Sequence, residues 1–187
     1  MVVIDGGTGS DFHTCQMKII GITYIEGKCH ITLKADTSLL IQGRPFFVPS
    51  WDSCFYAQPC LIVRICRLGK SIEGRFVHRY YDAVAYGLDF RAQDTLSSLR
   101  SQGADWSYAV SFDHSLCVGS FMKPEEISEA GYCMTITDAI CTISRYYTLH
   151  QGDYLFIDHR SGGEIVELNK IYHISQGDKN LLYCKIK

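Results

Sequence analysis

Residues 86–94, Tyr-Gly-Leu-Asp-Phe-Arg-Ala-Gln-Asp, combine a strand-like run with charged side chains. The aromatic and apolar residues on either side of Gly87 predict a β-strand. Asp94 precedes a predicted helix over 95–102, because its carboxylate can accept the first free amides of a helix. Asp89, near the end of the strand, suits a hard cation bound through oxygen, and it equally suits an ordinary turn.

Short strands dominate the pattern on both sides of this stretch. Runs rich in β-branched and aromatic residues, bounded by glycine, proline or aspartate, predict them. The predicted strands span 18–24, 29–33, 44–49, 61–67, 106–112, 116–121, 154–157, 164–168, 171–174 and 181–186. Helical spacing predicts helices over 95–102 and 137–149, and a short one within 76–86 that leads into a strand. Because strands and helices do not alternate regularly, the predicted fold class is β-rich α+β.

The first sixteen residues differ from the rest of the chain. Residues 5–10 read Asp-Gly-Gly-Thr-Gly-Ser, a composition typical of a flexible linker. Met17 then opens the first strand pattern. We therefore expect residues 1–16 to be a flexible leader or tag-like segment. Residues 17–187 are expected to form a single domain, which suits a chain of 187 residues.

Charge and hydropathy exclude several classes of function. A net charge of −2 argues against nucleic-acid binding, which needs a basic surplus. No apolar run approaches the roughly 18 residues of a membrane span, and the N-terminus lacks the pattern of a secretory signal. The nine cysteines are odd in number and include no CxxC pair, so we interpret them as reduced, packed thiols. The sequence thus predicts a cytoplasmic protein.

Three further patterns leave a chemical and a structural interpretation open. Asp113-His114 fits an acid–base pair or a loop. Residues 158–163, Asp-His-Arg-Ser-Gly-Gly, fit an anion site built from an arginine and glycine amides, or a polar turn. Cys60 and Cys66 would need a nearby base to act as nucleophiles, so packing is favoured. These residues alone predict a β-rich domain and indicate no specific activity.

Six segments stand in a recognisable order. They are the strand pattern at 17–24, Arg-Pro-Phe-Phe-Val-Pro at 44–49, the run 63–72 that ends in Gly-Lys-Ser-Ile, Gly-Leu-Asp within 86–94, Gly-Ala-Asp-Trp to Phe-Asp at 103–113, and Leu-His-Gln-Gly-Asp within 149–156. In this order and spacing they resemble the fumarylacetoacetate hydrolase family in its small single-domain form. The resemblance covers most of residues 17–157. It implies rolled mixed β-sheets around a central pocket, with a few short helices.

The resemblance also implies an activity and a cofactor. Family members cleave, decarboxylate or isomerise 2-oxo acids and acylpyruvates at C–C bonds, with Mg²⁺ or Mn²⁺, and they usually form homodimers. The ion chelates the carbonyl and carboxylate oxygens of the substrate and stabilises the enolate. Three acidic residues hold the ion, two from a Glu-x-Glu strand and one from the later Gly-x-Asp. A lysine two residues before the Phe-Asp adds positive charge.

This chain departs from the family pattern at the ligand positions. By resemblance its metal ligands would be Asp89, Gln58 and Cys60, of which only Asp89 is a carboxylate. Val110 stands at the lysine position, and Gly27 at the position of the usual histidine. One carboxylate, an amide and a thiol do not neutralise a divalent ion, and Mg²⁺ prefers hard oxygen ligands. We expect no cofactor, or weakly bound Mg²⁺ or Mn²⁺.

The substrate residues implied by the resemblance are Arg91, Arg160 and Tyr24. An arginine can hold a carboxylate through two parallel hydrogen bonds, and the ligand that the resemblance implies is a small 2-oxo acid. The expected protein partner is a second copy of the chain, or an intact family member in a heterodimer.

Loss of the ligand set within a retained scaffold predicts a divergent member that is catalytically impaired or inactive. The alternative is an active divalent-metal-dependent hydrolase, decarboxylase or isomerase that acts on C–C bonds of 2-oxo acids or acylpyruvates. In that case Asp89 would hold the ion.

Overall fold

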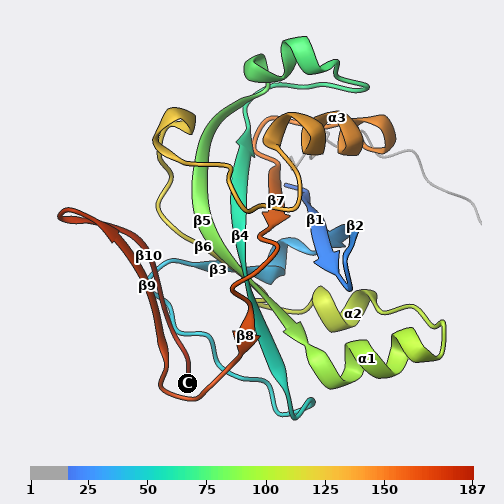
Figure 1. Ribbon diagram of the computed structural model, residues 1–187, viewed down its shortest axis with the longest axis vertical. Coiled ribbons are helices and arrows are strands. Elements are labelled where there is room, and N and C mark those ends of the chain that lie inside the picture. Colours follow the sequence, from blue (N-terminus) through green and yellow to red (C-terminus); the bar gives the residue numbers. More distant parts are fainter. Residues whose placement is uncertain (1–16) are drawn as a thin grey trace, which may run out of the picture.

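A mixed β-sheet carries the residues of interest in the computed structural model, which describes residues 17–187 (Figure 1). Its strands follow the order β2-β1-β7-β4-β5-β6-β3, with β8 paired to β4. The pairs β1–β7 and β3–β6 are parallel, and the other neighbours are antiparallel. The strands are β1 (Ile19–Ile25), β2 (Lys28–Lys34), β3 (Leu39–Ile41), β4 (Phe55–Ile65), β5 (Tyr81–Ala92), β6 (Leu116–Val118), β7 (Tyr154–Asp158) and β8 (Glu164–Ile165).

A second, two-stranded sheet lies beside the first. It consists of β9 (Ile171–Gln176) and β10 (Lys179–Lys185), which extend away from the body as a hairpin (Figure 1). The helices are α1 (Gln93–Ser101), α2 (Ser107–Val110) and α3 (Ile136–Tyr146), with 3-10 turns η1 (Asp36–Ser38), η2 (Gly74–Arg79) and η3 (Pro124–Glu126). Helices α1 and α2 lie near the tip of the β1–β2 pair, whereas α3 lies near the opposite end of the sheet (Figure 1).

The longest strands, β4 and β5, form the central pair and set the register of the site. Gln58 lies opposite Asp89, and Cys60 lies opposite Gly87. Because alternate residues of a strand share one face, Asp89 and Arg91 project to the same side. The register therefore brings Gln58 and Asp89 together, although they lie far apart in the chain.

The core consists of separate clusters that lie along the sheet. One packs α3, through Ile136, Ile140 and Ile143, against the residues of β1, β4 and β7. Another gathers Phe46 and Phe90, whose rings stack 3.9 Å apart, with residues of α2 and β10. Burial of these apolar side chains is the main favourable contribution to stability.

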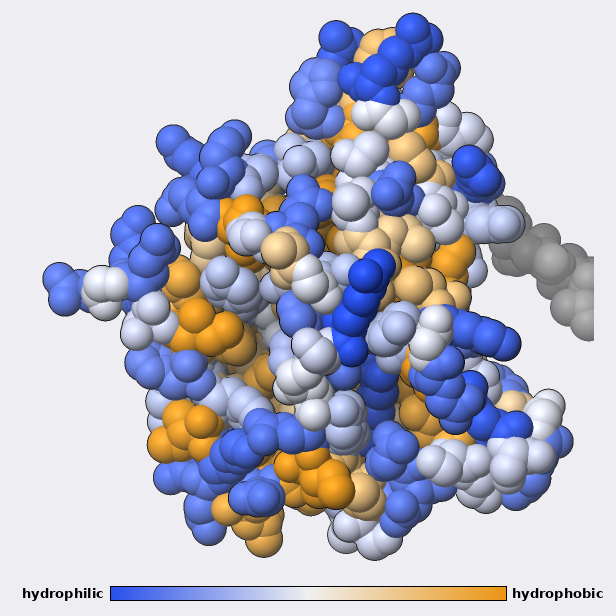
Figure 2. All heavy atoms as spheres, viewed as in Figure 1, coloured by the Kyte–Doolittle hydropathy of each residue, from blue (hydrophilic) through white to orange (hydrophobic). Residues whose placement is uncertain are grey.

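Apolar side chains also reach the surface near the C-terminal hairpin. Ile165, Leu168 and Ile171 are 50–68% exposed, and Figure 2 shows apolar patches over this part of the molecule. Among residues 17–187, no helix is both long and apolar enough to cross a membrane.

Most predicted elements are present with shifted ends, and the β-rich α+β class is confirmed. The predicted strand over 106–112 is wrong, because the segment forms α2, whose first turn begins where Ser107 N donates to Asp105 Oδ1 at 2.9 Å. The predicted strand over 44–49 is also wrong. Only Phe46 makes a bridge, to Ile186, and the flanking prolines have no N–H to donate to a ladder.

Two predicted helices have different boundaries. Helix α1 begins at Gln93, so Asp94 lies inside its first turn and accepts a hydrogen bond from Ser53 rather than capping the helix. The predicted helix over 137–149 spans Ile136–Tyr146, with Thr135 as its N-cap. The prediction of a flexible leader concerns residues 1–16, which lie outside the described residues.

Gly119 attaches the hairpin to the main sheet. A Cβ atom there would overlap the carbonyl oxygen of Leu181, while the next residue, Ser120, donates its amide to that oxygen at 2.8 Å. We expect Gly119→Ala to lower the free energy of unfolding by about 1–3 kcal/mol, because a backbone atom must move. Gly74→Ala is the control, since its Cβ would meet nothing closer than 3.5 Å. Urea denaturation compares them, and equal midpoints would contradict the expectation.

Candidate functional site: a buried charge cluster beside an arginine-lined cavity

Four charged side chains meet in the interior of the sheet, and we call them the charge cluster: Lys34, Asp89, Arg91 and Asp158. All four are buried, with exposed fractions of 0–6%. Asp89 contacts two of them, with Oδ1 lying 2.8 Å from Lys34 Nζ and Oδ2 lying 2.8 Å from Arg91 Nε. Arg91 Nη2 contacts Asp158 Oδ2 in turn. The cluster is thus a chain of alternating charges.

Three strands position these charges. Lys34 is the last residue of β2, Asp158 is the last residue of β7, and Asp89 and Arg91 lie on β5. Tyr24 of β1 closes the arrangement, because its amide donates to Asp158 Oδ2 at 2.6 Å and its carbonyl accepts from Arg91 Nη1 at 3.3 Å. Backbone and side chain therefore fix the guanidinium together.

The cluster balances its own charge. Two cations and two carboxylates sum to zero, which reduces the cost of burial, because an unpaired ion in the interior is strongly unfavourable. The Lys34–Asp89 contact is an ion pair rather than an aligned hydrogen bond, since Asp89 Oδ1 accepts no hydrogen bond from residues 17–187. Burial acts to lower the pKa of Arg91, but Asp158 and Asp89 outweigh it and raise this pKa above its ordinary value.

Asp158 has an altered pKa. Burial raises the pKa of this carboxyl to about 7, and nearby Asp89 adds to the rise, while Arg91 opposes it. Its Oδ1 atom has no hydrogen-bond partner among the described residues. Gain or loss of a proton by Asp158 therefore changes the net charge of the cluster near neutral pH.

A divalent ion does not fit the side chains present here. Both oxygens of Asp89 contact cationic groups. Gln58 directs its amide Nε2 to the carbonyl of His159 at 2.7 Å. Burial raises the pKa of the Cys60 thiol well above its ordinary value, with Asp89 and Asp158 adding to the rise, so the thiol keeps its proton and is a poor ligand. Within residues 17–187 no group of three His, Cys, Asp or Glu side chains is arranged to hold a metal ion.

A cavity of about 350 Å³ opens beside the cluster, and we call it the arginine cavity. The three predicted substrate residues, Tyr24, Arg91 and Arg160, all line it, and so does Gln58. Arg100 is a further lining residue, and its guanidinium pairs with Glu26 at 2.9 Å. A cavity with three guanidinium groups and one carboxylate suits an anionic ligand, because arginine binds carboxylates with two hydrogen bonds.

The other positions singled out by resemblance lie as follows. Val110 is buried in α2, and its carbonyl oxygen accepts a hydrogen bond from the ammonium of Lys34. Gly27 occupies the turn between β1 and β2 with a φ of +80°, a conformation that favours glycine. A lysine thus contacts the position where the resemblance expects one, although it comes from strand β2 and not from α2.

Lys34 and Asp158 were not identified as site residues from the sequence. The alternation of β2 suggests that Leu33 faces the core and Lys34 faces solvent, whereas Leu33 is 46% exposed and Lys34 is buried. Asp158 was part of a loop pattern, but it ends β7 and points inward. The structure shows the inward face of β2, because Thr32 shares the face of Lys34 and bonds to buried Thr23 at 2.7 Å.

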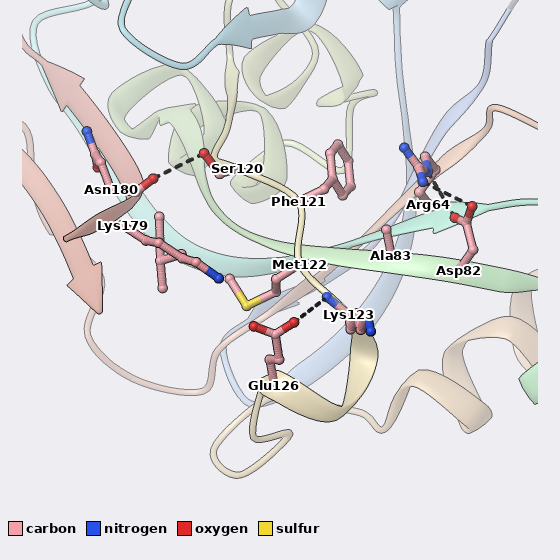
Figure 3. A pocket seen from close by; sticks show the side chains of 11 residues that line it. Arg64, Asp82, Ala83, Ser120, Phe121, Met122, Lys123, Glu126, Lys179 and Asn180 are labelled. Atoms are coloured by element: carbon pink, nitrogen blue, oxygen red, sulfur yellow. Dashed lines mark hydrogen bonds and ion pairs between the residues drawn. The ribbon is translucent and has the colours of Figure 1, made fainter. Parts of the chain in front are cut away.

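A larger cavity of about 740 Å³ lies elsewhere, between the hairpin and the loop that precedes η3 (Figure 3). Its polar groups pair among themselves, as Figure 3 shows for Arg64 with Asp82 and for the Lys123 amide with Glu126. None of the sequence-predicted site residues lines it. The smaller arginine cavity is therefore the candidate site.

Comparison by sequence finds no matching family model and no matching curated protein. Comparison by structure finds extensive matches. Fumarylpyruvate hydrolase from Pseudomonas aeruginosa, solved with Mn²⁺ and pyruvate, has a TM-score of 0.76 and 16% identity over 91% of this chain and 88% of its own. 5-Carboxymethyl-2-hydroxymuconate delta-isomerase from Mycobacterium smegmatis has a TM-score of 0.74 and 16% identity, with 90% and 78% covered.

A third match is 2-hydroxyhepta-2,4-diene-1,7-dioate isomerase from Mycobacterium marinum. It has a TM-score of 0.73 and 19% identity over 91% of this chain and 73% of its own. The chain therefore has the fold of these hydrolases and isomerases, as the resemblance in its sequence predicted.

Removal of one member of the charge cluster should be costly. We expect Arg91→Leu to lower the free energy of unfolding by about 3–5 kcal/mol, because two buried carboxylates lose a partner. Arg64→Leu is the matched control. It breaks a bidentate pair with Asp82, but that pair is 41–45% exposed, so the expected loss is about 0–1 kcal/mol. Chemical denaturation measures both, and similar losses would argue against a cluster that matters for stability.

Asp158 should make stability depend on pH. A folded pKa of about 7 exceeds the unfolded value near 4, so the folded state binds more protons between these values. Stability from this group is full below pH 4 and is lost as pH rises toward 7, by up to about 1.4 kcal/mol per pH unit. Asp158→Asn should therefore lose less stability than the original chain between pH 5 and pH 7. Parallel curves of unfolding free energy against pH would exclude this role.

Proposed function

We propose that this chain is a divergent member of the fumarylacetoacetate hydrolase family that binds a small 2-oxo acid or similar carboxylate without a divalent metal. The observation that carries the proposal is the double role of Arg91. Its Nε lies 2.8 Å from Asp89, and the same side chain lines the arginine cavity. The same side chain thus pairs with the one carboxylate that remains of the ligand set implied by the resemblance, and it reaches the cavity.

The side chains around the cavity have distinct roles in this proposal. Arg91 is held by Asp89, Asp158 and the Tyr24 carbonyl, so it presents its remaining N–H groups to a ligand in a fixed orientation. Arg160 is exposed, and among residues 17–187 its side chain makes one hydrogen bond, a long one of 3.5 Å to the Cys133 carbonyl, so the guanidinium can turn toward a carboxylate. Preorganised donors of this kind bind anions at low entropic cost.

Impaired catalysis is the second part of the proposal. Cleavage of a C–C bond beside a carbonyl needs a concentrated positive charge at the developing enolate. Here the carboxylate that would hold a metal is neutralised by side chains, and Cys60 is a protonated thiol. We infer binding with little or no turnover, and an active metal-dependent enzyme remains the alternative that the experiment below can reveal.

Partner and location follow from the family and stay predictions. A homodimer would cover apolar surface such as Ile165, Leu168 and Ile171. A heterodimer with an intact family member would use the same scaffold, and the cytoplasm is the expected location.

Calorimetric titration with oxalate or pyruvate in the presence of EDTA tests the proposal. We expect saturable binding, and Arg160→Gln should weaken it about 10-fold or more, because a charge-assisted hydrogen bond contributes about 1.5–3 kcal/mol. Lys123→Gln, at the other cavity, should leave the affinity unchanged.

Absence of binding in EDTA would refute the proposal. An acylpyruvate turnover assay with Mn²⁺ completes it, and rapid turnover that requires Asp89 would establish the active enzyme instead.

A further inference from the structure

The ammonium group of Lys34 lies among three oxygen atoms of different kinds. Asp89 Oδ1 is 2.8 Å away and Ser115 Oγ is 3.1 Å away, and the carbonyl oxygen of Val110 accepts a hydrogen bond. The ring of Phe156 lies on another side, with its centroid 5.5 Å from Nζ. The Lys34 side chain is 0% exposed, so no solvent shares in this coordination.

These three oxygens form a cation site by their chemistry. Carboxylate, hydroxyl and carbonyl oxygens are the ligands that hard cations take in proteins. A lysine ammonium is a cation with N–H donors and no acceptor, so it donates hydrogen bonds to Val110 and Ser115 while it pairs with Asp89 by charge. The oxygens come from β5, from α2 and from the residue before β6, so the tertiary structure assembles them around Nζ.

We propose that Lys34 is an internal cation, which occupies the position beside Asp89 that a free metal ion would otherwise take. The proposal goes beyond the proposed function, because it concerns what fills the cation position and not what binds in the arginine cavity. Lys34 acts as a positioning residue. It neutralises one oxygen of Asp89 and leaves the other to hold Arg91.

Charge arithmetic supports this role. Lys34 and Arg91 together supply two positive charges, the charge of one divalent ion, against the two carboxylates of the cluster. A metal ion at Asp89 would lie within a few ångströms of the ammonium, where repulsion in a buried site is severe. Removal of the ammonium would leave Asp89 with Arg91 as its remaining cationic partner, and it would leave three oxygens without a cation.

An entry path for a replacement cation exists next to the lysine. A cavity of about 410 Å³ is lined by Lys34 together with Ile19, Asp36 and Tyr147. Truncation of the lysine stem would join this cavity to the three oxygens. The variant Lys34→Ala should therefore admit small cations from solvent.

The test is a thermal melt of Lys34→Ala with and without an added cation. We expect a lower melting temperature than that of the original chain, and a rise of several degrees on addition of Mn²⁺ or of n-propylammonium, which replaces the deleted part of the side chain. 1-Propanol, which has the same size without the charge, should have no effect. Electron paramagnetic resonance should show Mn²⁺ bound at least about 10-fold more tightly by Lys34→Ala than by the original chain.

Lys18→Ala is the matched control. It removes another lysine that pairs with a buried aspartate, Asp153, at 2.8 Å, but the Lys18 side chain is 33% exposed, so this pair is accessible to solvent. This variant should not respond to either cation. Lys34→Met/Asp89→Asn, which removes both charges, should fold and also ignore Mn²⁺.

Two results would overturn the proposal. One is a folded Lys34→Ala that responds to neither cation, and the other is tight Mn²⁺ binding by the original chain. If Lys34→Ala does not fold on its own, refolding from urea only with Mn²⁺ or propylammonium supports the proposal, and failure with both counts against it. Oxalate binding by the original chain is measured separately, so the proposed function can fail while this inference holds.

Discussion

The arrangement depends on one constraint, the need to keep Asp89 neutralised inside the sheet. Burial of a carboxylate is tolerated only with close partners, and the partners here are an ammonium and a guanidinium at 2.8 Å. Arg91 in turn requires Asp158 and the carbonyl of Tyr24. Ion pairs and hydrogen bonds thereby connect four strands, β1, β2, β5 and β7, at the place where charged residues interrupt the apolar packing.

This cluster also connects the interior to the candidate ligand. Arg91 is the shared element, because it contacts both carboxylates and lines the arginine cavity. Any change in the charge of the cluster therefore reaches the cavity through one side chain whose position is fixed. Asp158, with a pKa raised to about 7 by burial, is the group through which pH would act.

The fold of this protein tolerates large differences in sequence. The fold is that of hydrolases and isomerases with TM-scores of 0.73–0.76, although identity is only 16–19%. A packed core tolerates exchange of apolar residues as long as the hydrophobic pattern and the total volume are kept, so a fold can be retained when most residues differ. A metal site tolerates far less, since ligand charge and geometry must both match. In the proposal made above, side-chain cations neutralise Asp89 in place of a metal ion.

The sequence by itself determined the β-rich class and the positions of most strands, because strand periodicity is a local signal. Arg91, Arg160 and Tyr24, which the resemblance suggested, line one cavity, and their role there stays a prediction. It did not reveal α2, where Asp105 initiates a turn within an apolar run. Only the tertiary structure decided that Lys34 points inward. Hydropathy assigns a lysine to solvent. The oxygens that make the burial of Lys34 favourable come from Asp89, Val110 and Ser115, which are distant in the chain and are brought together only by the fold.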